Sequence, residues 1–401
     1  MTGAGDPAPR PRPWRVRLRP IWLRAHLYLG LTLGLLLALL GLTGSFLVFN
    51  HAIDEWLNPA LLRATRPDAP RAPVAAIVQA ADAAARDLTP TSRLLMPPRH
   101  PGGVFVVYQT EPGEGHGRLT EIHVDPTTAL VLGRRVWGEY FVSWVYMLHS
   151  HLHAGEAGET AVGLSGVALL ASVATGLLLW WPILRRGGLR AAARVKRSHL
   201  NFDLHKVAGV GSSLALAVVA FSGVYMVFPH WFAAPLAAVA PLTPFVPVTN
   251  PPAPAGTAAE ITADAALDAA RPHFPGARWV ATSLPVKPTD PYVVTFRRPG
   301  EVRRTWGRCV AWVDRHTGAT LKVQDGNVQT AGDVFADWQF PLHNGEAFDL
   351  PGRWLVFATG LSPTLLGVTG ALLWWRKRRG RARQRARGVG HPRVARMAKS
   401  A

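Results

Sequence analysis

Four long apolar runs stand out from the alternation of hydrophobic and polar residues along the chain. None of them contains Lys, Arg, Asp or Glu. A helix needs about 20 apolar residues to cross a hydrocarbon core about 30 Å thick, and each run is long enough. The pattern therefore predicts four transmembrane helices, at Leu27–Phe49, Val162–Ile183, Val207–Phe228 and Trp354–Trp375.

The first run has an alternative interpretation, because basic residues precede it as they do in a secretory signal. The apolar region of a signal peptide is about 7–15 residues long and ends at a small-residue cleavage site. The run from Leu27 to Phe49 is longer, and no such site follows it. We therefore expect it to remain as a membrane anchor.

The two long segments between the runs are predicted to fold as small α+β modules. In each segment a helix-like stretch precedes two strand-like stretches and an Asp-Xaa-Xaa-Thr or Asp-Xaa-Xaa-Thr-Gly turn that begins at Asp125 or Asp314. The helix-like stretches are Val74–Arg86 and Ala258–Ala270, and the strand-like stretches are Val104–Tyr108, Glu121–Val124, Tyr292–Phe296 and Val310–Val313. The apolar segment Ala233–Pro247 contains four prolines, so we expect a surface or interfacial linker there and no fifth span.

The two halves of the chain repeat each other. In the first and third runs, a histidine precedes the glycine of a Thr-Gly or Ser-Gly pair by 18 residues; for the second and fourth runs the spacing is 27. The four pairs are His26 with Gly44, His205 with Gly223, His149 with Gly176, and His343 with Gly370. Two halves that run in the same direction are expected to be related by a pseudo-two-fold axis along the membrane normal.

The predicted fold class is a mainly α membrane protein, with four transmembrane helices in two tandem repeats and an α+β module inserted in each repeat. The boundaries follow from the runs. The expected parts are a basic N-terminus (1–24), the first helix (25–50), the first module (51–140), an approach and the second helix (141–184), a loop (185–204), the third helix (205–229), a linker and the second module (230–334), an approach and the fourth helix (335–375), and a basic tail (376–401).

The distribution of charge sets the orientation. Residues 1–24, 185–206 and 376–401 hold 24 of the 44 Lys and Arg residues but only two acids, whereas the two long segments carry a small net negative charge. Cytoplasmic flanks of membrane helices collect Lys and Arg, so both termini are expected in the cytoplasm and both modules outside. In a bacterial cell this places the chain in the inner membrane with periplasmic modules.

The net charge of +19 does not by itself indicate nucleic acid, because most of it flanks predicted membrane helices. The basic tail is better explained as a stop-transfer signal that binds anionic lipid. Cys309 is the only cysteine. Intrachain disulfides, thiolate iron–sulfur clusters and cysteine-rich zinc sites are therefore excluded.

Four of the fifteen histidines occupy equivalent points of the two repeats, beside membrane spans. His26 and His205 lie at the cytoplasmic starts of the first and third helices, and His149 and His343 lie on the external approaches to the second and fourth. The pseudo-two-fold axis would place the members of each pair opposite one another. Two facing imidazoles are what a planar haem needs as axial ligands, and helical bundles build cofactor sites from facing helices.

Other interpretations of the histidines remain open. Each one taken singly suits an interfacial anchor or a helix cap, and a zinc site would need three or four ligands where each face offers two. His151 and His153 are alternative ligands beside His149, without counterparts in the second repeat. His51 and His230 also repeat, at the external helix ends, and we interpret them as interfacial, with contact to the outer cofactor as the alternative. The glycines of the Thr-Gly and Ser-Gly pairs are expected to permit close helix packing, with room for a porphyrin as a second possibility.

Several motifs together carry a resemblance to a known family. They are His26-Leu-Tyr-Leu-Gly30 with Thr43-Gly44, Leu148-His149-Ser-His-Leu152-His-Ala-Gly155, Asp203-Leu-His205-Lys-Val-Ala-Gly209, Leu342-His343-Asn-Gly345, and the two external segments ending at Asp125 and Asp314. Over nearly its whole length the chain resembles the PepSY-associated transmembrane-helix proteins, a group that includes ferric-siderophore reductases of the bacterial inner membrane.

The resemblance implies two b-type haems, ligated by His26 with His205 and by His149 with His343. It also implies reduction of an external ferric siderophore or other Fe(III) chelate with electrons from the cytoplasm. The chain has no glycine-rich nucleotide fingerprint, so the donor is expected to be a separate cytoplasmic reductase or a membrane quinol. The alternatives are a cofactor-free regulatory or scaffold protein that binds a protease or peptide, and a haem or metal transporter.

Two sets of arginines are candidates for binding anions. Haem propionates or the membrane interface are the expected partners of Arg353 and Arg134 on the outer side and of Arg24 and Arg186 on the inner side. A second set flanks the predicted hairpin at Pro299-Gly300, where either an anionic chelate or solvent would meet it. This set is Arg297, Arg298, Arg303, Arg304 and Arg308.

Overall fold

The computed structural model describes residues 14–113, 117–193, 195–244, 246–253 and 259–389. The outer parts of both predicted basic ends, residues 1–13 and 390–401, and Ala258 of the second predicted module helix lie outside this range. The chain divides into two compact units. The helical unit is Met1–Ser45, Leu164–Phe221 and Phe357–Ala401, and the sheet unit is Phe46–Gly163 and Ser222–Val356.

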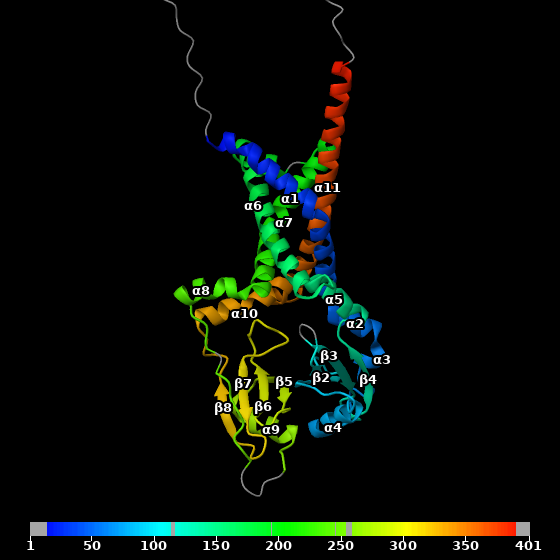
Figure 1. Ribbon diagram of the computed structural model, residues 1–401, viewed down its shortest axis with the longest axis vertical. Coiled ribbons are helices and arrows are strands. Elements are labelled where there is room, and N and C mark those ends of the chain that lie inside the picture. The colour runs from blue at the N-terminus through cyan, green and yellow to red at the C-terminus, as the bar shows by residue number, and fades with distance from the viewer. Residues whose placement is uncertain (1–13, 114–116, 194, 245, 254–258, 390–401) are drawn as a thin grey trace, which may run out of the picture. The chain divides into compact units, whose positions relative to one another are not determined.

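Four long helices supply the helical unit, and all four are long and apolar enough to cross a membrane. They are α1 (Trp14–Leu47), α6 (Gly155–Ala193), α7 (Leu200–Val227) and α11 (Asp349–Val389), seen in Figure 1. Helices α6 and α11 contain their predicted apolar runs whole, whereas α1 and α7 end two residues and one residue before theirs; all four extend beyond the run into polar or basic residues on at least one side. The prediction of four membrane helices is confirmed for the described part of the chain.

Within the helical unit, α1 and α11 lie close together at a pair of glycines. A Cβ atom on Gly41 would lie 2.2 Å from the carbonyl oxygen of Gly360, so neither position has room for a side chain. Ser45 Oγ donates a hydrogen bond of 2.8 Å to the carbonyl oxygen of Phe357 at the same crossing. Small residues and interhelical hydrogen bonds are the usual means by which helices associate in lipid.

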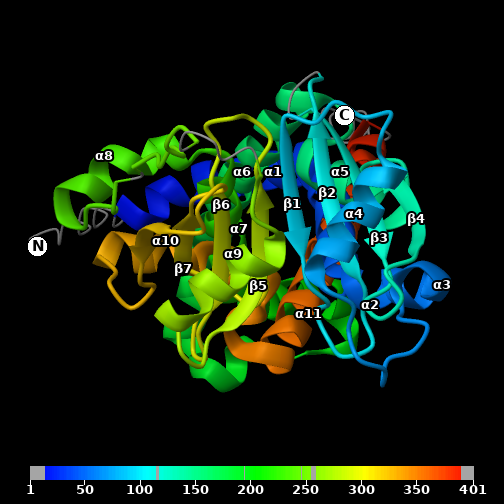
Figure 2. The same cartoon turned by 90° about the horizontal axis from the view of Figure 1, so that it is seen from below.

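The sheet unit contains one antiparallel sheet of eight strands, in the order β4-β3-β2-β1-β5-β6-β7-β8 (Figure 2). The strands are β1 (Ser92–Met96), β2 (Phe105–Glu111), β3 (Arg118–Val124), β4 (Val131–Val136), β5 (Arg278–Leu284), β6 (Tyr292–Arg297), β7 (Cys309–Val313) and β8 (Thr320–Gln324). The four predicted strands correspond to β2, β3, β6 and β7. The sequence did not predict the other four, nor that β1 pairs with β5 to join the two modules in one sheet.

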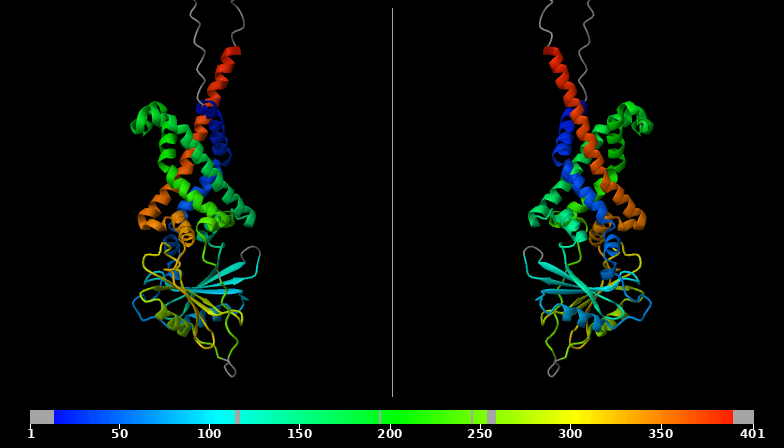
Figure 3. Two further views of the ribbon diagram at one scale, coloured as in Figure 1. Left: turned by 90° about the vertical axis from the view of Figure 1, so that its left-hand side faces the viewer. Right: turned by 90° about the vertical axis from the view of Figure 1, so that its right-hand side faces the viewer.

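Two helices cover one face of this sheet, α4 (Val74–Ala84) and α9 (Ala263–Ala270), as Figures 2 and 3 show. Their apolar sides bury Ile77, Ala81 and Ala266 against strand residues such as Val107 and Val294, all of them fully buried. Burial of this kind contributes about 25 cal/mol for each Å² of apolar surface removed from water. The predicted arrangement of a helix packed on strands is therefore found in both halves.

The remaining helices of the sheet unit are short. They are α2 (Asn50–Leu57), α3 (Pro59–Leu62), α5 (Phe141–His151), α8 (Pro229–Val239) and α10 (Ala331–Asn344), with a 3-10 turn at Glu346–Phe348. Helix α8 takes up the first part of the expected linker Ala233–Pro247 and has no buried residue. At about 1.5 Å per residue its 11 residues are too short to span a membrane.

Candidate functional site

The structure brings the four repeated histidines together in two pairs. In the helical unit, His26 of α1 and His205 of α7 have ring centroids 6.2 Å apart and ring planes at 83°. In the sheet unit, His149 of α5 and His343 of α10 also have centroids 6.2 Å apart, with planes at 57°. Each pair joins residues far apart in the sequence, as the repeat spacing predicts.

The ring of His26 is held through its Nδ1 atom. This nitrogen lies 3.1 Å from the carbonyl oxygen of Ser172 and 3.1 Å from Thr175 Oγ1, both on α6. A carbonyl oxygen only accepts hydrogen bonds, so Nδ1 must carry a proton and donate. The Nε2 atom is then the basic nitrogen of the neutral ring.

His205 is held in the same way by the fourth long helix. Its Nδ1 atom lies 2.9 Å from Thr369 Oγ1 of α11. The Thr369 hydroxyl donates to the carbonyl oxygen of Leu365 at 2.7 Å, so its oxygen is available to accept from the ring. In the sheet unit, His343 Nδ1 lies 3.2 Å from Ser222 Oγ, on a serine that is completely buried.

A glycine follows each of these hydroxyl residues and lies against the same imidazole. A Cβ atom on Gly176 would be 3.2 Å from His26 Cε1, on Gly370 it would be 3.3 Å from His205 Cε1, and on Gly223 it would be 3.1 Å from His343 Cε1. These glycines therefore make room for a histidine ring. The expected close helix packing is found at these three positions, where each glycine admits a histidine ring from another helix, whereas Gly41 and Gly360 bring two helix backbones together.

The paired rings suit a metal bound between them. An imidazole nitrogen binds a divalent metal at about 2 Å, so two rings on opposite sides of one metal have centroids about 6 Å apart. The hydrogen bonds of His26 to Ser172 and Thr175 and of His205 to Thr369 are all made through Nδ1. No three His, Cys, Asp or Glu side chains of the described chain gather as a metal site. The donor set fits a haem, which brings four nitrogens of its own, better than zinc.

The alternative histidines have other contacts. His151 Nδ1 lies 2.6 Å from Ser150 Oγ, and its Nε2 lies 3.8 Å from a carboxylate oxygen of Glu159. His153 stacks on Trp144 with ring centroids 4.7 Å apart. His51 is exposed at the start of α2, and His230 at the start of α8 meets the rings of Phe228 and Trp231 edge-on.

Two of the arginines considered for propionate binding are engaged elsewhere. Arg134 forms a bidentate ion pair with Asp87, at 2.7 and 2.8 Å, on the sheet. Arg353 donates to the carbonyl oxygen of Val48 and lies over the ring of Phe49, 4.8 Å from its centroid. Arg24 and Arg186 are exposed on α1 and α6.

The arginines around Pro299-Gly300 are largely neutralised within the sheet unit. Arg308 pairs with Asp337 at 2.6 Å, Arg298 with Asp325 at 3.1 Å, and Arg304 with Asp349. Arg303 lies 3.7 Å from Asp337, and Arg297 donates to the backbone carbonyls of Glu301 and Arg303. This set is therefore better explained by internal ion pairing than by binding of an anionic chelate.

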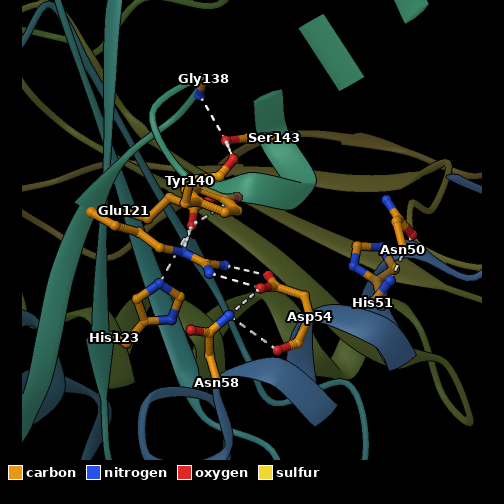
Figure 4. A network of polar contacts seen from close by, with 10 residues as sticks. Asn50, His51, Asp54, Asn58, Glu121, His123, Gly138, Tyr140 and Ser143 are labelled. Atoms are coloured by element: carbon orange, nitrogen blue, oxygen red, sulfur yellow. Dashed lines mark hydrogen bonds and ion pairs between the residues drawn. The ribbon is translucent and has the colours of Figure 1, made fainter. Parts of the chain in front are cut away.

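Sequence reasoning missed a buried polar network in the sheet unit (Figure 4). Arg135 of β4 contacts Asp54 at 2.6 and 3.0 Å and Glu121 at 2.7 Å, and its guanidinium lies 3.6 Å from the centroid of the Tyr140 ring. His123 is also fully buried, with Nε2 3.4 Å from Glu121. Burial alone would raise the pKa of Glu121, but His123 and Arg135 lower it overall. The network links α2, the sheet and the residue before α5.

Apolar helices of membrane-spanning length, together with the antiparallel sheet unit and its associated helices, define a polytopic membrane protein. The family model described as PepSY-associated TM region matches residues 23–377, and the chain belongs to this family. The match includes all four paired histidines. None of the curated proteins is a match for the chain.

Proposed function

We propose that this protein carries electrons across the bacterial inner membrane through two bis-histidine b-type haems and reduces ferric-siderophore or other Fe(III) chelates on the periplasmic side. His26 and His205 would hold one haem, and His149 and His343 the other. The observation that carries the proposal is the approach of these rings in two pairs, each with centroids 6.2 Å apart.

The surroundings of the rings support ligation. In the helical unit both Nδ1 atoms face oxygen acceptors on a neighbouring helix, which orients Nε2 as the metal-binding nitrogen. When bound, a haem with two imidazole ligands has no open coordination position and supplies single-electron transfer. The protein's part is to fix the ring orientation, to keep the site within apolar helices and to separate the two faces of the membrane.

The proposed topology has both termini in the cytoplasm and both halves of the sheet unit in the periplasm. It rests on the concentration of Lys and Arg in residues 1–24, 185–206 and 376–401. We interpret the chain as two tandem repeats, each of two membrane helices with an inserted PepSY-like module. The contact of Thr175-Gly176 with His26 and the equivalent contact of Thr369-Gly370 with His205 support this interpretation.

The electron donor is proposed to be a separate cytoplasmic reductase or a membrane quinol. The acceptor is a ferric chelate, because Fe(II) binds hard oxygen ligands less tightly than Fe(III) and is released on reduction. The internal ion pairs of Arg298, Arg304 and Arg308 argue against the Pro299-Gly300 hairpin as its docking site.

Haem quantitation of the purified full-length protein tests the proposal. We expect a Soret band, a reduced α-band at the b-type position and two haems per chain. His205→Ala is expected to lose one haem and His343→Ala the other. His199→Ala is the matched control, because His199 is exposed a few residues before His205 in the 3-10 turn Arg197–His199.

The two alternative functions, a cofactor-free scaffold and a transporter, predict different results. A colourless, correctly folded preparation would support the cofactor-free scaffold and end the haem proposal. In proteoliposomes with a reductant inside, the conduit reduces an external ferric chelate without uptake, whereas a transporter would show substrate flux. Full haem content in His205→Ala would refute the assignment of the pair in the helical unit.

A further inference from the structure

We propose that Thr369 and Thr175 are positioning residues, which fix the tautomer of His205 and His26 and thereby tune the affinity of the bound iron for electrons. This inference rests on the proposed function, because tuning has meaning only where a haem is bound. The tautomer itself is a property of the chain, and it can be measured separately.

The direction of the hydrogen bond from the Thr369 hydroxyl determines which nitrogen of His205 is protonated. A threonine hydroxyl has one proton, and the Thr369 hydroxyl lies 2.7 Å from the carbonyl oxygen of Leu365 and 3.3 Å from that of Leu366. Since a carbonyl cannot donate, the proton of Thr369 is committed to its own helix. Its lone pair is then what His205 Nδ1 meets at 2.9 Å, so Nδ1 must be the protonated nitrogen.

Thr175 repeats this arrangement at the other ring. Its hydroxyl donates to the carbonyl oxygen of Ala171 at 2.8 Å, and its oxygen lies 3.1 Å from His26 Nδ1. The carbonyl oxygen of Ser172 is a second acceptor for the same nitrogen. With the proton on Nε2 instead, the Nδ1 lone pair would face two oxygen lone pairs in an apolar environment, which is strongly unfavourable.

The adjacent glycine makes the contact possible. Gly370 leaves the edge of the His205 ring against the backbone of α11, where a Cβ atom would lie 3.3 Å from Cε1. The Thr-Gly dipeptide therefore combines an acceptor for Nδ1 with space for Cε1, and Thr175-Gly176 does the same for His26. Each Thr-Gly dipeptide is therefore a two-residue binding site for one imidazole ring.

The chemical consequence follows from hydrogen bonding beyond the metal. A hydrogen bond from the ring N–H to an acceptor raises the electron donation of the ligating nitrogen, and this favours the oxidised metal. A hydroxyl is a weaker acceptor than the carboxylate often found in this position. Removing it is therefore expected to shift the reduction potential in the positive direction without removing the ligand.

Thr369→Val tests the inference, because valine keeps the shape of threonine and lacks the hydroxyl acceptor, which leaves the backbone of Leu366 as the other hydrogen-bond partner of His205. We expect two haems to remain, with one of the two potentials shifted to a more positive value in a redox titration. Thr369→Ser, which keeps the hydroxyl, should restore the wild-type potential. Thr32→Val is the matched control, since Thr32 of α1 donates only to the carbonyl oxygen of Tyr28.

Unchanged potentials in Thr369→Val, or an equal shift in Thr369→Ser, would overturn the inference while leaving the haem proposal intact. A wild-type protein without haem would instead overturn the proposed function. In that case ¹⁵N spectra of histidine-labelled full-length protein still report the tautomer. If Nδ1 of His205 carries the proton in the wild type, and its signal is lost or shifted in Thr369→Val, the result supports the role of Thr369 in fixing the tautomer. A proton on Nε2 in the wild type refutes that role.

Discussion

Arg135 of β4 forms a bidentate ion pair with Asp54 of α2, with nitrogen–oxygen distances of 2.6 and 3.0 Å. Only 14% of the Arg135 side chain and 9% of the Asp54 side chain are exposed. Helix α2 follows α1 in the chain, so this pair fixes the first segment of the sheet unit to its sheet. Loss of a carboxylate partner leaves the charge of a buried guanidinium poorly compensated, which destabilises the folded state.

Asp54→Ala is therefore expected to lower the free energy of unfolding by about 3 kcal/mol, because it leaves the buried Arg135 with Glu121 as its remaining carboxylate. Thermal unfolding of the purified protein measures this. Glu55→Ala on the same helix is the control, since its partners Arg63 and His100 are 59% and 47% exposed and each such pair contributes about 0.5 kcal/mol or less. Equal losses in the two variants would contradict the importance of burial.

The crossing of α1 and α11 gives a second prediction. Gly41→Ala is expected to destabilise the helical unit by about 1–3 kcal/mol, because the new methyl group would lie 2.2 Å from the Gly360 carbonyl oxygen. Gly30→Ala makes the same change on the same helix with nothing within 4 Å, and should cost nothing. Thermal denaturation in detergent compares them. A stable Gly41→Ala protein would show that the crossing is looser than described.

Much of the fold could be predicted from the sequence, for identifiable reasons. The apolar run from Val207 to Phe228 needs only length and composition to indicate a span. Strands β2 and β6 were recognisable because apolar and β-branched residues follow one another in them. Strand β4 (Val131–Val136) contains Arg134 and Arg135, and β8 (Thr320–Gln324) is half polar, so neither has a pattern that distinguishes it from a loop. The pairing of β1 with β5 depends on tertiary contacts that no local pattern contains.

Part of the candidate site could also be predicted from the sequence, and part of it could not. The equal spacing from His26 and His205 to the glycines that follow them led us to expect that the two rings approach each other, and their centroids lie 6.2 Å apart. The spacing also marked Thr369-Gly370, but its contact with His205 depends on which side of α11 faces α7. The network around Arg135 was missed because charged residues in a strand usually face solvent.

The N-terminal cap of α10 predicts that the stability of the folded protein falls at low pH. Burial would raise the pKa of Asp333, but hydrogen bonds from Thr243 and Thr330 lower it to about 2. A carboxylate with a depressed pKa stabilises the fold above its unfolded pKa of about 4, and this contribution is lost as the pH falls towards 2. Asp333→Asn should therefore cost about 1–2 kcal/mol at pH 6, with the difference from wild type falling to about a third of that at pH 2.5.

Thermal unfolding across this pH range measures the difference. Asp68→Asn is the control, because the side chain of Asp68 is exposed in a turn and its substitution should leave the free energy of unfolding unchanged. A difference for Asp333→Asn that stays constant from pH 6 to pH 2.5 would mean that the carboxylate charge contributes nothing to the cap.

Substitutions near the turn between α5 and α6 can distinguish the proposed ligand His149 from the nearby His153. Leu152 and His153 both have positive φ, 49° and 53°, a conformation that asparagine tolerates better than most residues. His153→Asn should therefore preserve the turn, lose only the stacking on Trp144, and keep both haems. His149→Ala should lose one haem, because its ring is the one that pairs with His343. Haem quantitation and the reduced α-band decide between them: one haem in His153→Asn, with two in His149→Ala, would reassign the ligand to the turn.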